Sequence, residues 1–200
     1  MIKILFICHG NICRSPMAEF ILKDMLQKKN LADDFYVASA ATSDEEIWRG
    51  IGNPVYPPAK KILAAHGISC EGKRAVKLER SDYEAYDYLI CMDDRNILNA
   101  KRILGGDPEG KLHKLMEFAD EGQGRSVPGH VRQARKAGDF RRTVETWSET
   151  DAKRDRYARD VADPWYTGDF ETAYEDIVSG CEGFLRWLKS AGSDGLNCAD

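Results

Sequence analysis

The residues best suited to chemistry lie near the N-terminus, where a cysteine and an arginine are separated by five residues. The segment from Cys8 to Ser15 reads CHGNICRS and follows a short apolar run, with Pro16 next. A loop of this size that closes onto a helix can wrap its backbone N–H groups around one phosphate, because amides at a helix N-terminus attract anions. Arg14 adds a planar fork for two phosphate oxygens. The pattern predicts a phosphate-binding loop with a nucleophilic cysteine.

Cys8 is the predicted nucleophile, because the helix dipole and the Arg14 guanidinium both favour a thiolate at this position. During transfer, Arg14 can also stabilise charge on the equatorial phosphate oxygens. Gly10 allows a backbone conformation that other residues resist, and Ser15 followed by Pro16 suits the start of a helix. The loop residues that we expect to contact the substrate are His9, Gly10, Asn11, Ile12, Cys13 and Ser15.

Transfer to sulfur also needs a proton for the departing oxygen, and Asp163 is the best source in the sequence. Pro164 stiffens the backbone beside this carboxyl group, and Trp165 and Tyr166 offer an apolar wall for an aromatic substrate. Asp163 would protonate the leaving phenolate and then activate water against the thiophosphate. Since Asp-Pro alone is a common turn dipeptide, this assignment depends on the Cys8 loop.

Alternating apolar runs and helical patterns must position these residues. Strands are predicted at 2–7, 35–41, 88–92 and 112–118, and helices at 16–28, 57–66, 94–104 and about 169–189. This alternation indicates an α/β domain with a parallel sheet flanked by helices on both faces. Ligands in such sheets bind beyond the carboxyl ends of the strands, which is where the Cys8 loop falls.

Residues 119–160 differ in composition from the rest of the chain, with ten Lys or Arg, eight Asp or Glu and few large apolar residues. This composition predicts a charged, solvated and partly helical insertion. A weak stripe at Phe140, Val144 and Trp147 would instead allow docking on the body or on a partner. We therefore expect one domain over 1–190, an insertion at about 119–160 and a flexible tail at 191–200.

Composition limits the remaining possibilities. The 200 residues are 42% hydrophobic and 31% charged, which is typical of one soluble globular domain. A net charge of −4 gives no support for nucleic-acid binding. No apolar run approaches the ~20 residues of a membrane span, and the N-terminal run is too short for a signal peptide. We expect a cytoplasmic protein whose six cysteines form neither a disulfide framework nor a zinc site, with no cofactor.

The motif CHGNICRSPMAE at 8–19, with DPWY at 163–166, resembles the low-molecular-weight protein tyrosine phosphatases. The segments SAA at 39–41, HGI at 66–68 and DYLICMD at 87–93 are also similar to that family. The resemblance implies a four-stranded parallel sheet and hydrolysis of phosphotyrosine in a protein substrate, with release of inorganic phosphate. It implies Cys8 as nucleophile, Arg14 as phosphate ligand and Asp163 as general acid and base.

The resemblance further implies a hydrogen-bond network that holds the loop in shape, formed by Asn11, Ser15, Ser39 and His66. Cys13 matches the family's second loop cysteine, which could form a reversible disulfide with Cys8, or it is a small packing residue. Two segments depart from the family. Residues 119–160 exceed its usual length, and the loop at 44–52, which carries Trp48, is longer than usual where the family lines its substrate cleft. We expect Trp48 to contact the substrate.

Three alternatives remain open at this point. An arginine phosphatase of the same family would carry threonine where this chain has Ile12. An arsenate reductase of the same fold would need a close pair of resolving cysteines, and neither Cys70 nor Cys91 has one. A non-catalytic phosphate-binding scaffold would not need Cys8 and Asp163 intact. A weak homodimer is a further expectation.

Overall fold

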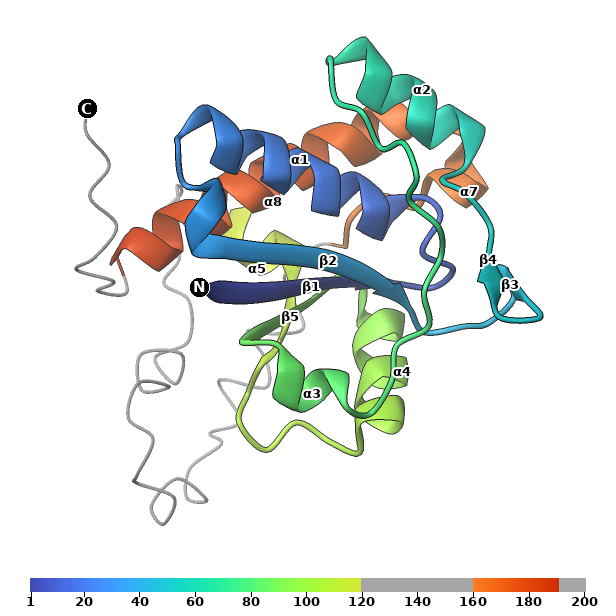
Figure 1. Ribbon diagram of the computed structural model, residues 1–200, viewed down its shortest axis with the longest axis vertical. Helices are drawn as coiled ribbons and strands as arrows, with labels where there is room; N and C mark the ends of the chain where they lie inside the picture. Colours follow the sequence, from blue (N-terminus) through green and yellow to red (C-terminus); the bar gives the residue numbers. More distant parts are fainter. Residues whose placement is uncertain (120–159, 191–200) are drawn as a thin grey trace.

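A four-stranded parallel sheet lies at the centre of the computed structural model, which describes residues 1–119 and 160–190 (Figure 1). The strands are β1 (Ile2–Cys8), β2 (Phe35–Ala41), β5 (Tyr88–Cys91) and β6 (Leu112–Lys114). Their order is β2-β1-β5-β6 with every pairing parallel, as predicted. The chain runs outward from β1 to β2 on one side and later to β5 on the other. Such a switch point favours ligand binding beyond the carboxyl end of β1.

Helices cover both faces of the sheet, and the strand pleat explains why (Figure 1). Alternate residues of β1 point to opposite sides: Ile4 and Phe6 join the core beneath α1 (Arg14–Lys28) and α8 (Phe170–Ser190). Leu5 and Ile7 join a second core with α3 (Asp82–Ala85) and α4 (Asp94–Leu104). α2 (Pro57–Ala65) packs on α1 and α8. Because both faces are buried, β1 is apolar along nearly its whole length.

The fourth predicted strand is partly wrong. Only Leu112–Lys114 pair with β5, and the following residues form α5 (Leu115–Ala119). Leu115, Met116 and Phe118 are buried against α8, and an apolar run alone cannot separate a buried strand from a buried helical turn.

Short elements that the sequence analysis did not predict connect these layers. They are a 3-10 turn η1 (Ala32–Asp34), a two-stranded hairpin of β3 (Ile47–Trp48) and β4 (Ile51–Gly52), the short helix α3, and α7 (Pro164–Thr167). The predicted insertion and tail lie outside the described residues, apart from residues 119 and 160. Within the described ranges, no helix has the length and apolar character needed to cross a bilayer.

A close helix contact gives the first prediction. A Cβ at Gly183 of α8 would collide with the backbone carbonyl of Phe118 in α5. We expect Gly183→Ala to lower the free energy of unfolding by about 1–3 kcal/mol, because the two helices must separate. Chemical denaturation measures this change. Glu182→Ala, at the neighbouring exposed position of α8, is the control. Equal stability of both variants would mean that the helices do not pack this closely.

Candidate active site

The Cys8 side chain ends β1 and is 3% exposed. Its sulfur accepts hydrogen bonds from the Ser15 hydroxyl (2.9 Å) and the Asn11 backbone N–H (3.3 Å). These two donors fix the position of the sulfur at the start of the loop. Ser15 does not cap the helix, since α1 begins at Arg14 and its N-cap, Cys13, makes no side-chain capping bond. The Ser15 hydroxyl serves the sulfur instead.

Asn11 holds the loop in its strained shape. Its φ of 55° lies in the left-handed region, which asparagine tolerates better than most residues. Its amide nitrogen donates to Ser15 Oγ (2.9 Å) and Ser39 Oγ (2.8 Å). Gly10, predicted to supply the unusual backbone angle, does not have a positive φ. A Cβ at Gly10 would instead lie 3.1 Å from Glu46 Cγ, so glycine gives the hairpin loop room to approach.

The carbonyl groups of the loop bond to flanking segments. The carbonyls of Cys8 and His9 accept from the N–H groups of Thr42 and Ser43, both at 2.9 Å. The Ile12 carbonyl accepts from the Tyr56 N–H at 2.8 Å. These bonds turn the carbonyl groups toward the neighbouring chain and away from the centre of the loop, as a phosphate nest requires.

A buried carboxylate supports the loop from behind. Ser39 Oγ donates to Glu19 Oε2 (2.6 Å), and Glu19 also pairs with Lys73 (2.8 Å) and Lys23 (2.5 Å). Burial acts to raise the pKa of Glu19, but the two lysines and the Ser39 hydroxyl outweigh it and hold this pKa below its usual range. Glu19 is therefore an acceptor that fixes the Ser39 hydroxyl, and through it the Asn11 amide.

His66 does not join this network, which corrects the expectation from the resemblance. Its ring stacks on Tyr174 at 3.9 Å between centroids and lies 3.6 Å from a Glu171 oxygen. The Asn11 amide oxygen accepts from the backbone N–H of Val76 (3.0 Å) and from no histidine among the described residues. The chain at 75–76 approaches the loop so closely that a backbone donor takes this place.

Arg14 is 4% exposed and lies between two carboxylates. Its Nη1 donates to Asp93 Oδ2 (2.8 Å), and its Nη2 is 2.7 Å from Asp163 Oδ2. Burial acts to lower the pKa of Arg14, but the negative charges of Cys8, Asp163 and Asp93 raise it above its usual value. Asp93 also caps α4 by accepting from the Asn96 N–H at 2.6 Å. One carboxylate therefore fixes both the arginine and the helix that follows β5.

The segment that carries Asp163 is anchored at three successive residues. Asp160 pairs with the buried Lys114 (3.0 Å), and the Val161 N–H donates to the Met92 carbonyl (2.9 Å). The Ala162 N–H donates to Oδ2 of the buried Asp176 of α8 (3.0 Å). Asp163 Oδ1 then accepts from the Trp165 N–H (3.1 Å) and so caps α7. These anchors fix the direction from which the Asp163 carboxyl reaches Arg14.

Exposed aromatic side chains border the loop. Trp48, Trp165 and Tyr166 are all largely exposed. The Trp165 ring lies 5.7 Å from that of Tyr56, whose backbone N–H bonds to the loop at Ile12. Trp48 lies on the β3–β4 hairpin, two residues after Glu46, whose side chain approaches Gly10. These rings can line the path of an aromatic substrate. His9, also exposed, turns its ring to Glu45 (3.0 Å).

Several residues of this site were missed by sequence reasoning. Asp93 and Glu19 were quoted as part of the resemblance without a role, and Tyr56, Lys73 and Asp176 were not singled out. A polar residue directly after a buried strand, as in Met92-Asp93, was a usable signal for Asp93, because carboxyl ends of parallel strands meet at one edge. Asp176 had no such signal, since charged residues within a helical pattern usually face solvent.

The other four described cysteines have thiols whose pKa is raised. Burial, together with the nearby charges of Cys8 and Asp163, raises the pKa of Cys13 to about 12. Burial also raises the pKa values of Cys70, Cys91 and Cys181. Cys91 is the last residue of β5 and is fully buried, so it cannot serve as a mobile resolving thiol. Among the described residues, no group of three His, Cys, Asp or Glu side chains is arranged to hold a metal.

The fold and the loop together define a class of protein. A parallel α/β sheet whose first strand leads into a Cys-x5-Arg loop at a helix N-terminus suits a phosphatase that uses a cysteine nucleophile. The model of the family described as low molecular weight phosphotyrosine protein phosphatase matches residues 3–129. The chain belongs to this family of hydrolases, which confirms the resemblance. Its activity is cysteine-based hydrolysis of phosphotyrosine.

Individual proteins of known sequence or structure are similar to most of this chain. The chain is 31% identical to the low molecular weight protein-tyrosine-phosphatase YfkJ of Bacillus subtilis, over 94% of this chain and 97% of YfkJ. It is 32% identical to PtpA of Staphylococcus saprophyticus, over 94% of each. The crystal structure of YfkJ matches with a TM-score of 0.71 over 95% of this chain and 96% of YfkJ, at 32% identity. The crystal structure of a Drosophila arginine phosphatase matches with a TM-score of 0.66 over 94% of this chain and 98% of that chain, at 25% identity.

The contrast among the cysteines is testable by alkylation. At pH 6.5, brief exposure to iodoacetamide should modify Cys8 and leave Cys13 unmodified, because a thiol with a pKa of about 12 stays protonated. Peptide mass spectrometry locates the modification. Cys198→Ser is the background, because Cys198 lies outside the described residues. Inorganic phosphate should protect Cys8. Equal modification of Cys13 would contradict the assignment.

Proposed function

We propose that Cys8, Arg14 and Asp163 are the nucleophile, the phosphate ligand and the general acid and base of this protein tyrosine phosphatase. The observation that carries the proposal is the placement of Arg14. Its guanidinium is buried, is held on one nitrogen by Asp93 and meets Asp163 on the other. Cys8 opens the same loop, with two donors directed at its sulfur. Nucleophile, phosphate ligand and acid thus meet at the carboxyl end of β1.

The chemistry proceeds in two balanced steps. The Cys8 thiolate attacks phosphorus and forms an S–P bond, while the P–O bond to the tyrosine ring breaks and Asp163 gives its proton to the departing oxygen. Asp163, now a carboxylate, takes a proton from water as the water oxygen attacks phosphorus and the S–P bond breaks. Inorganic phosphate and the thiolate are released. A phosphate that binds the Arg14 guanidinium through two nitrogens would replace Asp163 at Nη2. The Asp163 carboxyl group would then be free for proton transfer.

The remaining predicted residues receive supporting roles in this proposal. The loop residues from His9 to Cys13, with Ser15, surround the phosphate, and Asn11, Ser15 and Ser39 hold the loop. Trp48, Trp165 and Tyr166 flank the phosphotyrosine ring. A protein carrying phosphotyrosine is the proposed substrate, and a weak homodimer is a further expectation. We place the phosphatase domain at residues 1–190, in the cytoplasm.

Tyrosine is favoured over arginine as the phosphorylated side chain by Ile12. This residue is buried beside Cys13 and Ala75 and offers no hydroxyl to steer a guanidinium. YfkJ and the Staphylococcus saprophyticus PtpA, both named as tyrosine phosphatases, also share more sequence with this chain than that arginine phosphatase does.

Turnover of aryl phosphate at pH 5 to 7 tests the roles of Cys8 and Asp163. Cys8→Ser should abolish turnover, because a hydroxyl is not ionised at these pH values. Asp163→Ala should lower kcat about 10²- to 10⁴-fold, which is the usual contribution of general acid catalysis. Glu175→Gln, an exposed carboxylate on α8, is the matched control and should leave kcat unchanged.

Phosphoarginine is the second substrate in that experiment. Turnover of phosphoarginine alone would move the protein to the arginine branch. Turnover of neither substrate by the wild type would favour a phosphate-binding role without catalysis.

The anchor of the acid segment gives a separate prediction. Asp176→Ala removes the acceptor of the Ala162 N–H and should misdirect Asp163. We expect kcat to fall about tenfold for phenyl phosphate and less for aryl phosphates with more acidic phenols, since these need less protonation. Asp176→Asn keeps an acceptor oxygen and should restore activity. An equal loss for all leaving groups would indicate a general loss of structure instead.

A further inference from the structure

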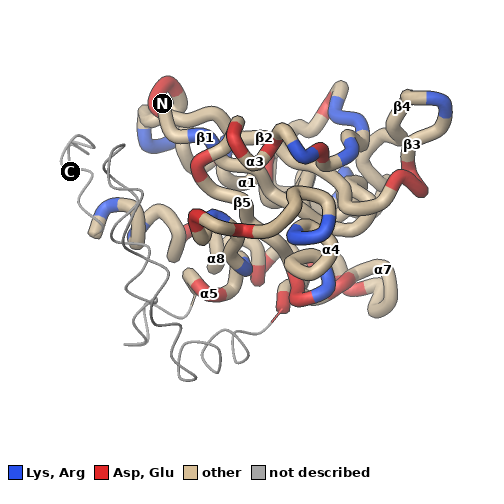
Figure 2. Tube along the Cα trace, turned by 90° about the horizontal axis from the view of Figure 1, so that it is seen from below, with Lys and Arg blue, Asp and Glu red and all other residues tan. Residues whose placement is uncertain are grey.

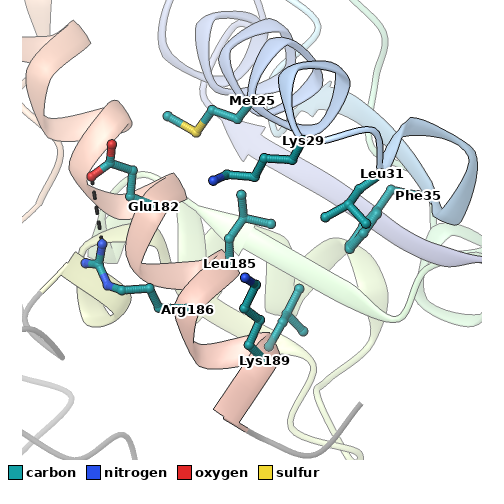
Figure 3. Close-up of a pocket in the computed structure, with 9 residues that line it drawn as sticks. Met25, Lys29, Leu31, Phe35, Glu182, Leu185, Arg186 and Lys189 are labelled. Atoms are coloured by element: carbon teal, nitrogen blue, oxygen red, sulfur yellow. Dashed lines mark ion pairs between the residues drawn. The ribbon is translucent and has the colours of Figure 1, made fainter. Parts of the chain in front are cut away.

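A cavity of about 310 Å³ lies at the far end of α1 from the phosphate loop (Figure 3). α1 begins at Arg14 and is 15 residues long, so its last turn lies about 22 Å from the site along the helix axis. The cavity is enclosed by this last turn, by the start of β2 and by the final turns of α8. It belongs to neither the loop nor the aromatic border described above.

The interior of the cavity is apolar. Met25, Leu31, Phe35 and Leu185 line it, and Figure 3 shows Met25 on α1, Leu185 on α8, and Leu31 and Phe35 near the start of β2. Leu31 and Phe35 are 7% exposed and Leu185 is 8% exposed, so they form its walls without projecting outward. The volume is at the small end of the range for ligand sites, which bind apolar groups and use a few polar ones for orientation.

Positive charge collects at the rim. Lys29 extends from the end of α1 and Lys189 from the end of α8, and both side chains reach across the cavity (Figure 3). Arg186 is 3.8 Å from Glu182, which also lines the cavity. Lys28, the residue before Lys29, pairs with Asp24 at 2.7 Å. Neither Lys29 nor Lys189 has an ion-pair partner among the described residues. Elsewhere along the trace, residues of both signs are interspersed (Figure 2).

We propose that this cavity binds a small amphiphilic carboxylate, with its hydrocarbon chain among Met25, Leu31 and Leu185 and its carboxylate between Lys29 and Lys189. An apolar interior selects a hydrocarbon group, and two ammonium groups from different helices select an anion. The occupant is a free molecule and not a membrane lipid. Leu31, Phe35 and Leu185 are buried in the walls of the cavity and do not project outward, as side chains that insert into a bilayer must.

Such a ligand would bridge α1 and α8. These two helices pack directly on each other, and one opens with Arg14 while the other begins a few residues after Asp163. A bound carboxylate would neutralise the two lysines and tie the helix ends together. The expected consequence is a more stable native state, with no contact at the phosphate loop.

The test uses the full-length protein with saturating inorganic phosphate, so that the phosphate loop is already occupied. Octanoate is titrated while the methyl resonances of Met25, Leu31 and Leu185 are followed by NMR. These resonances should shift together and saturate. At ten times Kd the melting temperature should rise by about 3–5 °C, as mass action predicts for a chain of this size. Acetate, octan-1-ol and octyltrimethylammonium should bind at least tenfold more weakly.

Variants that remove the charge of the lysines test whether Lys29 and Lys189 bind the carboxylate, separately from the apolar interior. The double variant Lys29→Gln/Lys189→Gln should weaken octanoate binding at least tenfold, while Lys61→Gln, an exposed lysine of α2, should not. Turnover of aryl phosphate should be the same in all of them.

Any one of five results would overturn the proposal. Acetate binding as well as octanoate would mean simple anion attraction. Octan-1-ol binding equally well, or an unaffected double variant, would remove the role of the lysines. Methyl shifts elsewhere would locate the ligand outside the cavity. Binding to phosphatidylglycerol vesicles without binding of free octanoate would make this end of the molecule a membrane contact instead.

Discussion

The burial of one arginine between two carboxylates is the interaction on which the site depends. A guanidinium removed from water is costly unless its donors are satisfied, and Asp93 and Asp163 supply that compensation from two distant parts of the chain. Asp93 arrives at the end of β5, next to β1 in the sheet. Asp163 arrives on a segment that is itself bonded to the chain after β5, to β6 and to α8. The arginine thus depends on the packing of nearly every layer.

A second constraint acts behind the loop. The buried Glu19 keeps its negative charge because two lysines pair with it. It accepts from the Ser39 hydroxyl, and the Asn11 amide donates to both Ser39 and Ser15. The Ser15 hydroxyl in turn donates to the Cys8 sulfur. The left-handed backbone at Asn11 is maintained by this chain. The loop is therefore rigid before any phosphate arrives, which is the general requirement for stabilising charge as it develops.

The sequence predicted the parts of the site that depend on local pattern and missed those that depend on packing. Cys8, Arg14 and the Asp163 segment follow from residue type, spacing and a strand before a helix. The role of Ser15 was misjudged, because a serine at a helix start can serve either the backbone or the sulfur, and spacing does not decide between them. His66 was misplaced because the approach of residues 75–76 to the loop is a tertiary contact. The end of the fourth strand was wrong because apolar residues fit a buried helical turn equally well.

The ion pair between Lys114 and Asp160 has a consequence for how this family can vary. Lys114 lies just before the chain leaves the described body at Ala119, and Asp160 is the residue at which it returns. The two ends of the intervening segment are thus held together by Lys114, which also pairs with Asp94 at the start of α4. Loop-closure entropy grows only slowly with length, so the segment between them can lengthen, shorten or be exchanged at little cost. The sequence of that segment can therefore change during evolution, for example to contact new partners, while Asp163 keeps its position relative to Cys8.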